Sequence, residues 1–205
     1  MRHFMKYQYI TIENETGSGG TEIANIVANE CGLPCFGAKE ILQKVSHDYS
    51  FSAEQIKEYE KSITGSFLYS YYVLQQIKNH NHSELPIEGQ IYSAEKETIK
   101  KLASSGPAVF IGHCTAEVLK DSGNVLRVFI KADQEDKIRC FSDKYNLERG
   151  SPEGMLHRLD ENRSRYYFFG SGKRWKNKEN YDLYLDRSQL GISGCVDLIK
   201  KKFEE

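Results

Sequence analysis

The stretch that decides the fold is YITIENETGSGGTEIANIVANEC, which runs from Tyr9 to Cys31. Its first residues are β-branched and aromatic, and they predict a strand from Tyr7 to Ile12. A glycine cluster follows, and the apolar residues after it recur at helical spacing, which predicts a helix from about Gly20 to Glu30. A strand, a glycine-rich turn and a helix in this order are typical of loops that cradle phosphate groups.

This loop lacks the lysine that most phosphate loops use for charge. The phosphate-loop pattern is glycine, four residues, glycine-lysine and serine or threonine, and here it aligns with Asn14 to Thr21. Asn14 replaces the first glycine and Gly20 replaces the lysine. Backbone N–H groups can still receive an anion, and a threonine hydroxyl can bind Mg²⁺. The candidate nucleotide-phosphate site is Gly17, Ser18, Gly19, Gly20 and Thr21, with Thr21 as the Mg²⁺ ligand. The alternative is a plain turn that needs glycine for its backbone angles.

The composition is that of an ordinary soluble protein. Among 205 residues, 39% are hydrophobic and 28% are charged, and the formal net charge is -1. This balance gives no general attraction to nucleic acid or to an anionic membrane, and no apolar run is long enough to span a bilayer. The start MRHFMKYQYITI has no apolar core, so we expect no signal peptide. The five cysteines are scattered, which fits reduced thiols in the cytoplasm.

Strands and helices alternate again in the second half of the chain. Apolar runs predict strands over Ala108–Gly112 and Val125–Ala132, and a last strand over Tyr181–Asp186 precedes a helix from Ile192 to Phe203. The order predicts one α/β domain, a doubly wound parallel sheet with helices on both faces. Ligands of such sheets bind beyond the carboxyl ends of the strands. The glycine loop, Gly112-His113 and the turn after Ala132 would meet at that edge.

The segment from Ala38 to Ala103 is more polar and is predicted to be helical, with a helix from Ile91 to Ala103. Ser52 and Gln55 form a capping-box pattern. The aromatic run Phe67–Tyr72 could stack a base, although packing within the helices is the alternative.

Five blocks resemble the cytidylate kinase-like family, a branch of the P-loop nucleoside monophosphate kinases. They are ITIENETGSGGTEIA, PAVFIGHCTAEVL, NVLRVFIKADQEDKIR, DENRSRYYFFGSGKRW and NYDLYLDRSQLGISGCVDLI. The resemblance implies a three-layer αβα P-loop fold. It implies a core of residues 1–37, 104–145 and 176–205, a helical substrate-binding insertion over about 38–103, and a lid over about 146–175. The implied activity is phosphoryl transfer from ATP, with Mg²⁺, to a nucleoside monophosphate such as CMP.

The chain departs from these relatives where charge matters. Relatives tend to read Ser-Arg-Glu-Tyr where this chain has Glu13 to Thr16, and Gly-Arg where it has Gly112-His113. They often read Tyr-Asp-Lys where this chain has Phe36 to Ala38, so an aspartate that could contact substrate is absent. Glu13 and Glu15 also lie beside the loop, and their repulsion opposes phosphate binding unless Mg²⁺ bridges them.

Arginines of the lid are the candidate replacements for the missing charge. Arg158, Arg163 and Arg165 are the predicted catalytic residues, because arginine suits bidentate phosphate contacts. The resemblance supports Arg163 in particular. Helical spacing places Arg158 and Arg165 on one face, whereas Arg163 and Arg165 point apart unless they lie at a helix end. The alternative is a solvated charged face paired with Asp160 and Glu161.

His113 is the predicted substrate-binding residue of the middle strand. It could contact phosphate when protonated, or it could form hydrogen bonds within the sheet edge. Asp133 and Asp136 are expected to be helix caps. The pair Cys31 and Cys35, and the nearby imidazoles of HNH (80–82), do not make a four-ligand zinc set.

Two functions therefore stay open, and a third possibility is that the chain does not bind nucleotide at all. One is a nucleoside monophosphate kinase with altered loop chemistry, and the other is a non-catalytic nucleotide-binding or regulatory protein on the same fold. Both predict nucleotides as the small-molecule partners and predict neither nucleic acid nor a membrane as a partner. The sequence does not indicate the oligomeric state.

Overall fold

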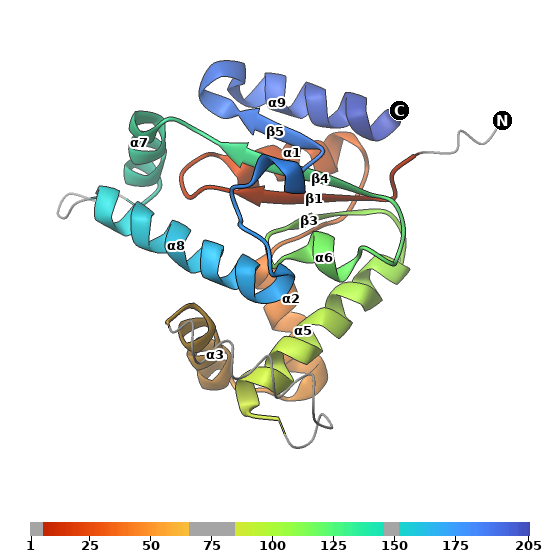
Figure 1. The fold of residues 1–205 in the computed structure, drawn as a ribbon. Helices are drawn as coiled ribbons and strands as arrows, with labels where there is room; N and C mark the ends of the chain where they lie inside the picture. The colour runs from red at the N-terminus through yellow and green to blue at the C-terminus, as the bar shows by residue number, and fades with distance from the viewer. Residues whose placement is uncertain (1–5, 66–84, 146–151) are drawn as a thin grey trace.

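The computed structural model describes residues 6–65, 85–145 and 152–205, and it shows a central parallel sheet between layers of helices (Figure 1). Its five strands are paired in the order β2-β3-β1-β4-β5. The strands are β1 (Tyr9–Asn14), β2 (Cys35–Phe36), β3 (Ala108–Ile111), β4 (Val125–Lys131) and β5 (Leu183–Asp186). All pairings are parallel, so the carboxyl ends of the strands lie at one edge, as predicted.

The sheet is buried on both faces because its central strands carry apolar residues in both directions. On one face Ile10 and Ile12 pack against α1 (Gly20–Glu30) and α9 (Arg187–Glu204). On the other face Tyr9 and Phe110 pack against α5 (Ile87–Ser104), with α6 (Thr115–Val118) on the same side (Figure 1). This is the three-layer αβα architecture that the alternation of apolar runs and helices predicts.

The first strand lies two residues further along the chain than predicted. Glu13 and Asn14 are polar, yet they pair with Phe129 and Ile130 of β4 and so extend β1 to Asn14. Pairing by the neighbouring strand overrides the polar character of these side chains. The extension places the Glu13 side chain at the carboxyl edge.

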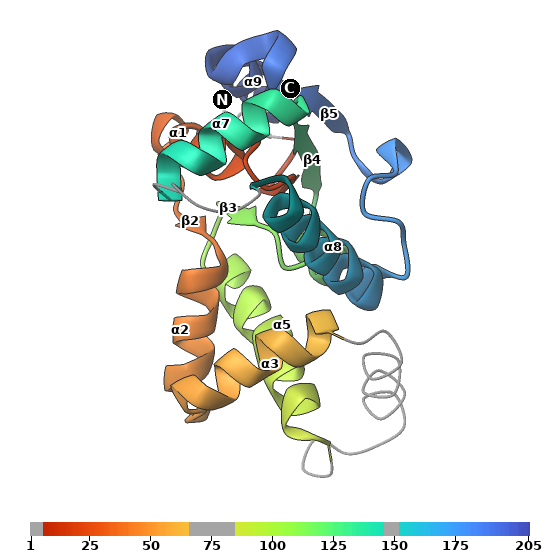
Figure 2. The ribbon, with the colours of Figure 1, turned by 90° about the vertical axis from the view of Figure 1, so that its left-hand side faces the viewer.

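Three helices of the segment between β2 and β3 extend away from the sheet (Figure 2). They are α2 (Ala38–Tyr49), α3 (Ala53–Gly65) and α5, which begins at Ile87, ahead of the predicted start. The capping box before α3 is confirmed: Gln55 N donates to Ser52 Oγ at 3.2 Å, and Ser52 N donates to Gln55 Oε1 at 2.7 Å. The aromatic run Phe67–Tyr72 and the two histidines of the HNH segment lie outside the described residues.

Two further helices lie beside the carboxyl edge. They are α7 (Gln134–Tyr145) and α8 (Pro152–Ser171), and a 3-10 turn over Lys178–Asn180 leads to β5. Trp175 is buried against Phe129 of β4, with ring centroids 5.3 Å apart, so it fixes the segment after α8 to the sheet. Helix α9 is interrupted at Gly191, where φ is 69°, and its regular part starts at Ile192 as predicted.

No helix among the described residues is long and apolar enough to cross a membrane.

Candidate functional site

The glycine loop between β1 and α1 closes around the carbonyl oxygen of Glu15. Ser18 is fully buried, and both its N–H (3.1 Å) and its hydroxyl (2.8 Å) donate to that oxygen. Gly17 and Gly19 adopt φ values of 80° and 78°, a region that favours glycine. The structure therefore contains the strand, turn and helix that the sequence predicts, with the helix starting at Gly20.

Asn14 and Gly20, the two residues that depart from the phosphate-loop pattern, lie in direct contact. A Cβ atom added at Gly20 would lie 2.3 Å from Cβ of Asn14, which is far inside van der Waals contact. The Asn14 side chain fills this space and donates from Nδ2 to the Glu15 carbonyl oxygen at 2.9 Å. Position 20 therefore has no room for a lysine while position 14 carries asparagine.

A cleft of about 550 Å³ opens at the carboxyl edge beside this loop. It brings together three predicted site residues, Thr21, His113 and Arg163. Asn14 and Asn25 line it from the loop side, and the segment from Gly37 to Glu40 lines it from the start of α2. The cleft thus lies between the two ends of the glycine loop, the end of β3, the start of α2, and α8. The predicted phosphate-site residues Gly17, Ser18, Gly19 and Gly20 do not line it.

Arg163 is the predicted lid arginine that reaches the loop. From α8, its Nη1 donates to the carbonyl oxygen of Asn14 at 2.5 Å. Helix α8 continues unbroken to Ser171, so Arg165 points away from Arg163 and lies near Glu161, with Nη2 3.7 Å from its carboxylate. Neither Arg158 nor Arg165 lines the cleft. The structure therefore does not bring the three arginines together in one site.

His113 is held in place by a buried carboxylate. Its φ is 57°, an uncommon value for a non-glycine residue, and its Nδ1 contacts Oε1 of Glu95. Glu95 is 1% exposed and also accepts from the hydroxyls of Tyr59 at 2.6 Å and Tyr166 at 2.7 Å. Burial raises the pKa of Glu95, but His113 and the two tyrosines outweigh it, and the pKa lies below its usual range.

Glu13 reaches the cleft from the end of β1. Its carboxylate accepts from Nε1 of Trp175 at 2.9 Å and from the backbone N–H of Cys114 at 3.2 Å. Burial raises the pKa of Glu13, and the hydrogen bond from Trp175 and the nearby Arg163 offset only part of that rise. Glu13 therefore places a poorly solvated carboxyl group at the cleft wall.

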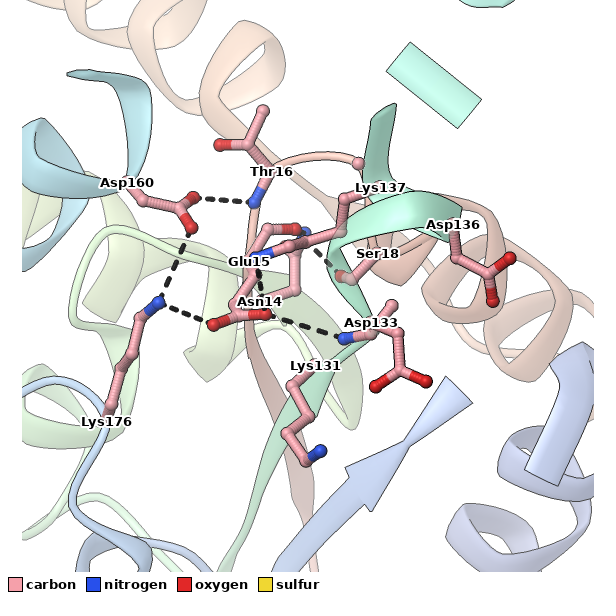
Figure 3. A network of polar contacts seen from close by, with 12 residues as sticks. Asn14, Glu15, Thr16, Ser18, Lys131, Asp133, Asp136, Lys137, Asp160 and Lys176 are labelled. Carbon is pink, nitrogen blue, oxygen red and sulfur yellow. Dashed lines mark hydrogen bonds and ion pairs between the residues drawn. The ribbon is translucent and has the colours of Figure 1, made fainter. Parts of the chain in front are cut away.

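The expected repulsion from Glu15 is compensated in the structure. Lys176 Nζ lies 2.5 Å from its Oε1 and Lys137 Nζ lies 3.1 Å from its Oε2 (Figure 3). Burial raises the pKa of Glu15, but the two lysines outweigh it, so the pKa lies below its usual range. The two lysines therefore offset the negative charge of Glu15, which the sequence alone does not indicate.

Several residues near the loop were not predicted. Lys137 lies on the helix after β4, and Arg187 follows β5 directly and donates from Nε to the Ser18 carbonyl oxygen at 3.2 Å. The rule that ligands meet the carboxyl ends of strands could have indicated both, since both follow such ends. Asp160 and Lys176 reach the loop because α8 and the segment after it pack against the sheet edge. No local sequence pattern indicates such packing.

The expected cap residues at the start of α7 have other partners. Asp136 lies in the first turn, accepts from the Ser188 hydroxyl at 2.6 Å, and lies 3.9 Å from Arg187. Asp133 directly precedes the helix, and its N–H donates to the Ser188 hydroxyl at 2.9 Å. These contacts join α7 to the start of α9.

The cleft contains the residue that the sequence predicts as a Mg²⁺ ligand. Thr21 is exposed and lines the cleft, so its hydroxyl is available as an oxygen ligand. Within the described ranges, no three histidine, cysteine or acidic side chains are grouped as a metal site.

The model of the cytidylate kinase-like family matches residues 9–189 of the chain. A crystal structure of an uncharacterized protein from Eubacterium ventriosum is similar, with a TM-score of 0.70 and 18% identity, covering 96% of this chain and 98% of that one. TT1252 from Thermus thermophilus has a TM-score of 0.52 and 15% identity, with 95% of each chain covered. Shikimate kinase from Bacteroides thetaiotaomicron has a TM-score of 0.51 and 9% identity, covering 96% and 98%. At these identities the likeness concerns the fold alone. None of the curated proteins compared matches.

Proposed function

The chain belongs to the cytidylate kinase-like family, and from this premise we propose that it transfers a phosphoryl group from ATP to a nucleoside monophosphate, with CMP as the first candidate. The observation that carries the proposal is the cleft at the carboxyl edge. There Asn14 and Thr21, at the two ends of the glycine loop, line one volume of about 550 Å³ together with His113 and Arg163, and this volume suits a small-molecule ligand.

Phosphoryl transfer requires positioning and positive charge more than covalent chemistry. Loop N–H groups and the positive end of α1 would receive the ATP phosphates, and Thr21 would hold Mg²⁺ through its hydroxyl. Mg²⁺ bound with ATP supplies charge neutralisation between the phosphate groups. Arg163, which lines the cleft, would approach the group being transferred.

The division into parts belongs to the same proposal. Residues 38–103 would form the substrate-binding insertion, and residues 146–175 would form a lid over the core. In a closed lid, Arg158 and Arg165 could approach the nucleotide from outside the cleft, and their catalytic role stays a prediction. His113, fixed by Glu95, would contact the acceptor.

The test is a coupled assay of ADP formation with ATP, Mg²⁺ and a panel of nucleoside monophosphates. We expect ADP formation that depends on the acceptor, fastest with a pyrimidine monophosphate. A complete lack of turnover across the panel would reject the kinase proposal.

A non-catalytic nucleotide-binding protein is the second candidate. It is favoured by the missing lysine at Gly20 and by Glu13, whose buried carboxyl group stands close to the loop. This candidate predicts that ATP raises the melting temperature while no phosphoryl transfer occurs. A ligand at about 100 times its Kd adds about 2.7 kcal/mol, which corresponds to a shift of about 5–10 °C in a chain of this size. Adenosine, which lacks the phosphates, is the matched control ligand.

A further inference from the structure

Asp160 of α8 holds a backbone N–H group of the glycine loop. Its Oδ1 accepts from Thr16 N at 2.7 Å, and Asp160 is only 9% exposed. Figure 3 shows this carboxylate reaching the loop. Backbone N–H groups of phosphate loops are the groups that receive phosphate oxygens. A carboxylate therefore occupies a position that suits an external anion.

The same loop residue, Thr16, also has a buried side-chain hydroxyl. Within the described part of the chain, this hydroxyl makes no hydrogen bond. Leaving a buried hydroxyl unpaired costs free energy, so such groups call for an explanation. An oxygen-rich ligand at Thr16 would supply the missing partner.

Two ammonium groups stand beside this position. Lys176 Nζ lies 3.5 Å from Asp160 Oδ2 and also pairs with Glu15, which in turn pairs with Lys137. The four side chains carry two positive and two negative charges, so they balance while Asp160 is in place. If Asp160 moves away, one positive charge remains for a ligand.

The cluster is open to solvent through a hollow between α7 and α8. The hollow has a volume of about 350 Å³, and Lys137, Asp160 and Lys176 line it together with His157 and Ser164. Gly17 permits the close approach of α7, because a Cβ atom there would lie 2.5 Å from the carbonyl oxygen of Lys137. Lys137 is thereby fixed beside the loop.

The geometry points to Lys137 and Lys176 as the source of the positive charge that the loop lacks at Gly20. They bind the phosphates of a polyphosphate at Thr16, and Asp160 occupies that position until the polyphosphate displaces it. This inference rests on the proposed function, in which ATP is the polyphosphate. It assigns binding roles to two lysines and a competing role to Asp160.

Calorimetric titration of the whole chain with sodium tripolyphosphate, without Mg²⁺, tests the inference. Asp160→Asn should bind about tenfold more tightly, because the neutral amide gives up the Thr16 N–H group more readily, and Lys176→Gln should bind about tenfold more weakly. Lys176 is half-exposed, and in the Lys176→Gln variant Lys137 still pairs with the buried Glu15 carboxylate. Asp121→Asn and Lys44→Gln make the same charge changes at exposed positions and should match the wild type.

The inference is overturned if Asp160→Asn binds tripolyphosphate no more tightly than the wild type, or if Lys176→Gln binds it as tightly as the wild type. It is also overturned if neither the wild type nor Asp160→Asn binds tripolyphosphate.

The ADP assay separates this inference from the proposed function. If both variants bind as expected while no acceptor is phosphorylated, the site stands and the kinase proposal fails. If Lys176→Gln forms ADP as fast as the wild type at limiting ATP, the kinase proposal stands and the site is rejected.

Discussion

At the scale of single residues, Asn14 and Gly20 have to be understood as a pair. Each departs from the phosphate-loop pattern, and in the sequence the two departures look independent. In the structure the Asn14 side chain lies over the Cα of Gly20, so a larger residue at one position requires a smaller one at the other. The missing lysine is therefore a consequence of packing in the loop as well as a loss of charge.

This pairing predicts non-additive mutations. Gly20→Lys alone should lower the free energy of unfolding by about 1–3 kcal/mol, the usual cost of overpacking a filled site. Asn14→Gly combined with Gly20→Lys should recover most of that loss, because the asparagine side chain no longer occupies the space. Urea unfolding of the two single variants and the double variant completes the cycle. Additive losses in the double variant would show that the two positions do not share this space.

A substitution at Gly17 tests a second close contact of the loop, the one with the backbone of Lys137. Gly17→Ala should destabilise the protein by about 2–4 kcal/mol, because it adds strain at positive φ to a clash with the backbone of Lys137. Gly172→Ala is the matched control, since Gly172 has a φ of 69° and open space where Cβ would lie. The control should show only the strain, about 1–2 kcal/mol. Equal losses in the two variants would contradict a close approach of α7.

At the scale of elements, Glu95 joins parts of the chain that are far apart in sequence. It lies on α5 and contacts Tyr59 of α3, Tyr166 of α8 and His113 after β3. One buried carboxylate thus fixes the helical segment, α8 and the sheet edge relative to one another. This arrangement positions His113 at the cleft. It also predicts that the folded protein loses stability as the pH becomes acidic.

The pKa of Glu95 in the folded protein lies below its ordinary value of 4.5. Its stabilisation is therefore present above pH 4.5 and is lost as the pH falls through the lowered value. In urea unfolding between about pH 6 and pH 3, Glu95→Gln should lose less stability than the wild type over that range. Glu97→Gln, on the exposed side of the same helix, should follow the wild type. Parallel curves for Glu95→Gln and the wild type would argue against an ionised Glu95 in the folded state.

At the scale of the whole molecule, the sequence predicts the parallel sheet, α1 and the position of the loop and His113 at the carboxyl edge. Those features follow from apolar runs and helical spacing, which are local signals, whereas Arg163 was singled out by the family resemblance. The extension of β1 to Asn14 was missed because pairing with β4 decides it. Lys176 and Asp160 were missed because they reach the loop through the packing of α8 and Trp175. Glu15 was judged by its charge alone, without the lysines that neutralise it.

The central claim is that the cleft containing Arg163 is a site of phosphoryl transfer, and the most direct test is the rate of CMP-dependent ADP formation by Arg163→Ala. The loss of a cation that stabilises the transferring group should lower kcat/KM by about 10²–10³-fold. Arg139→Ala, which removes an exposed arginine of α7, should remain close to the wild type. A wild-type rate in Arg163→Ala, with the same acceptor dependence, would contradict the claim.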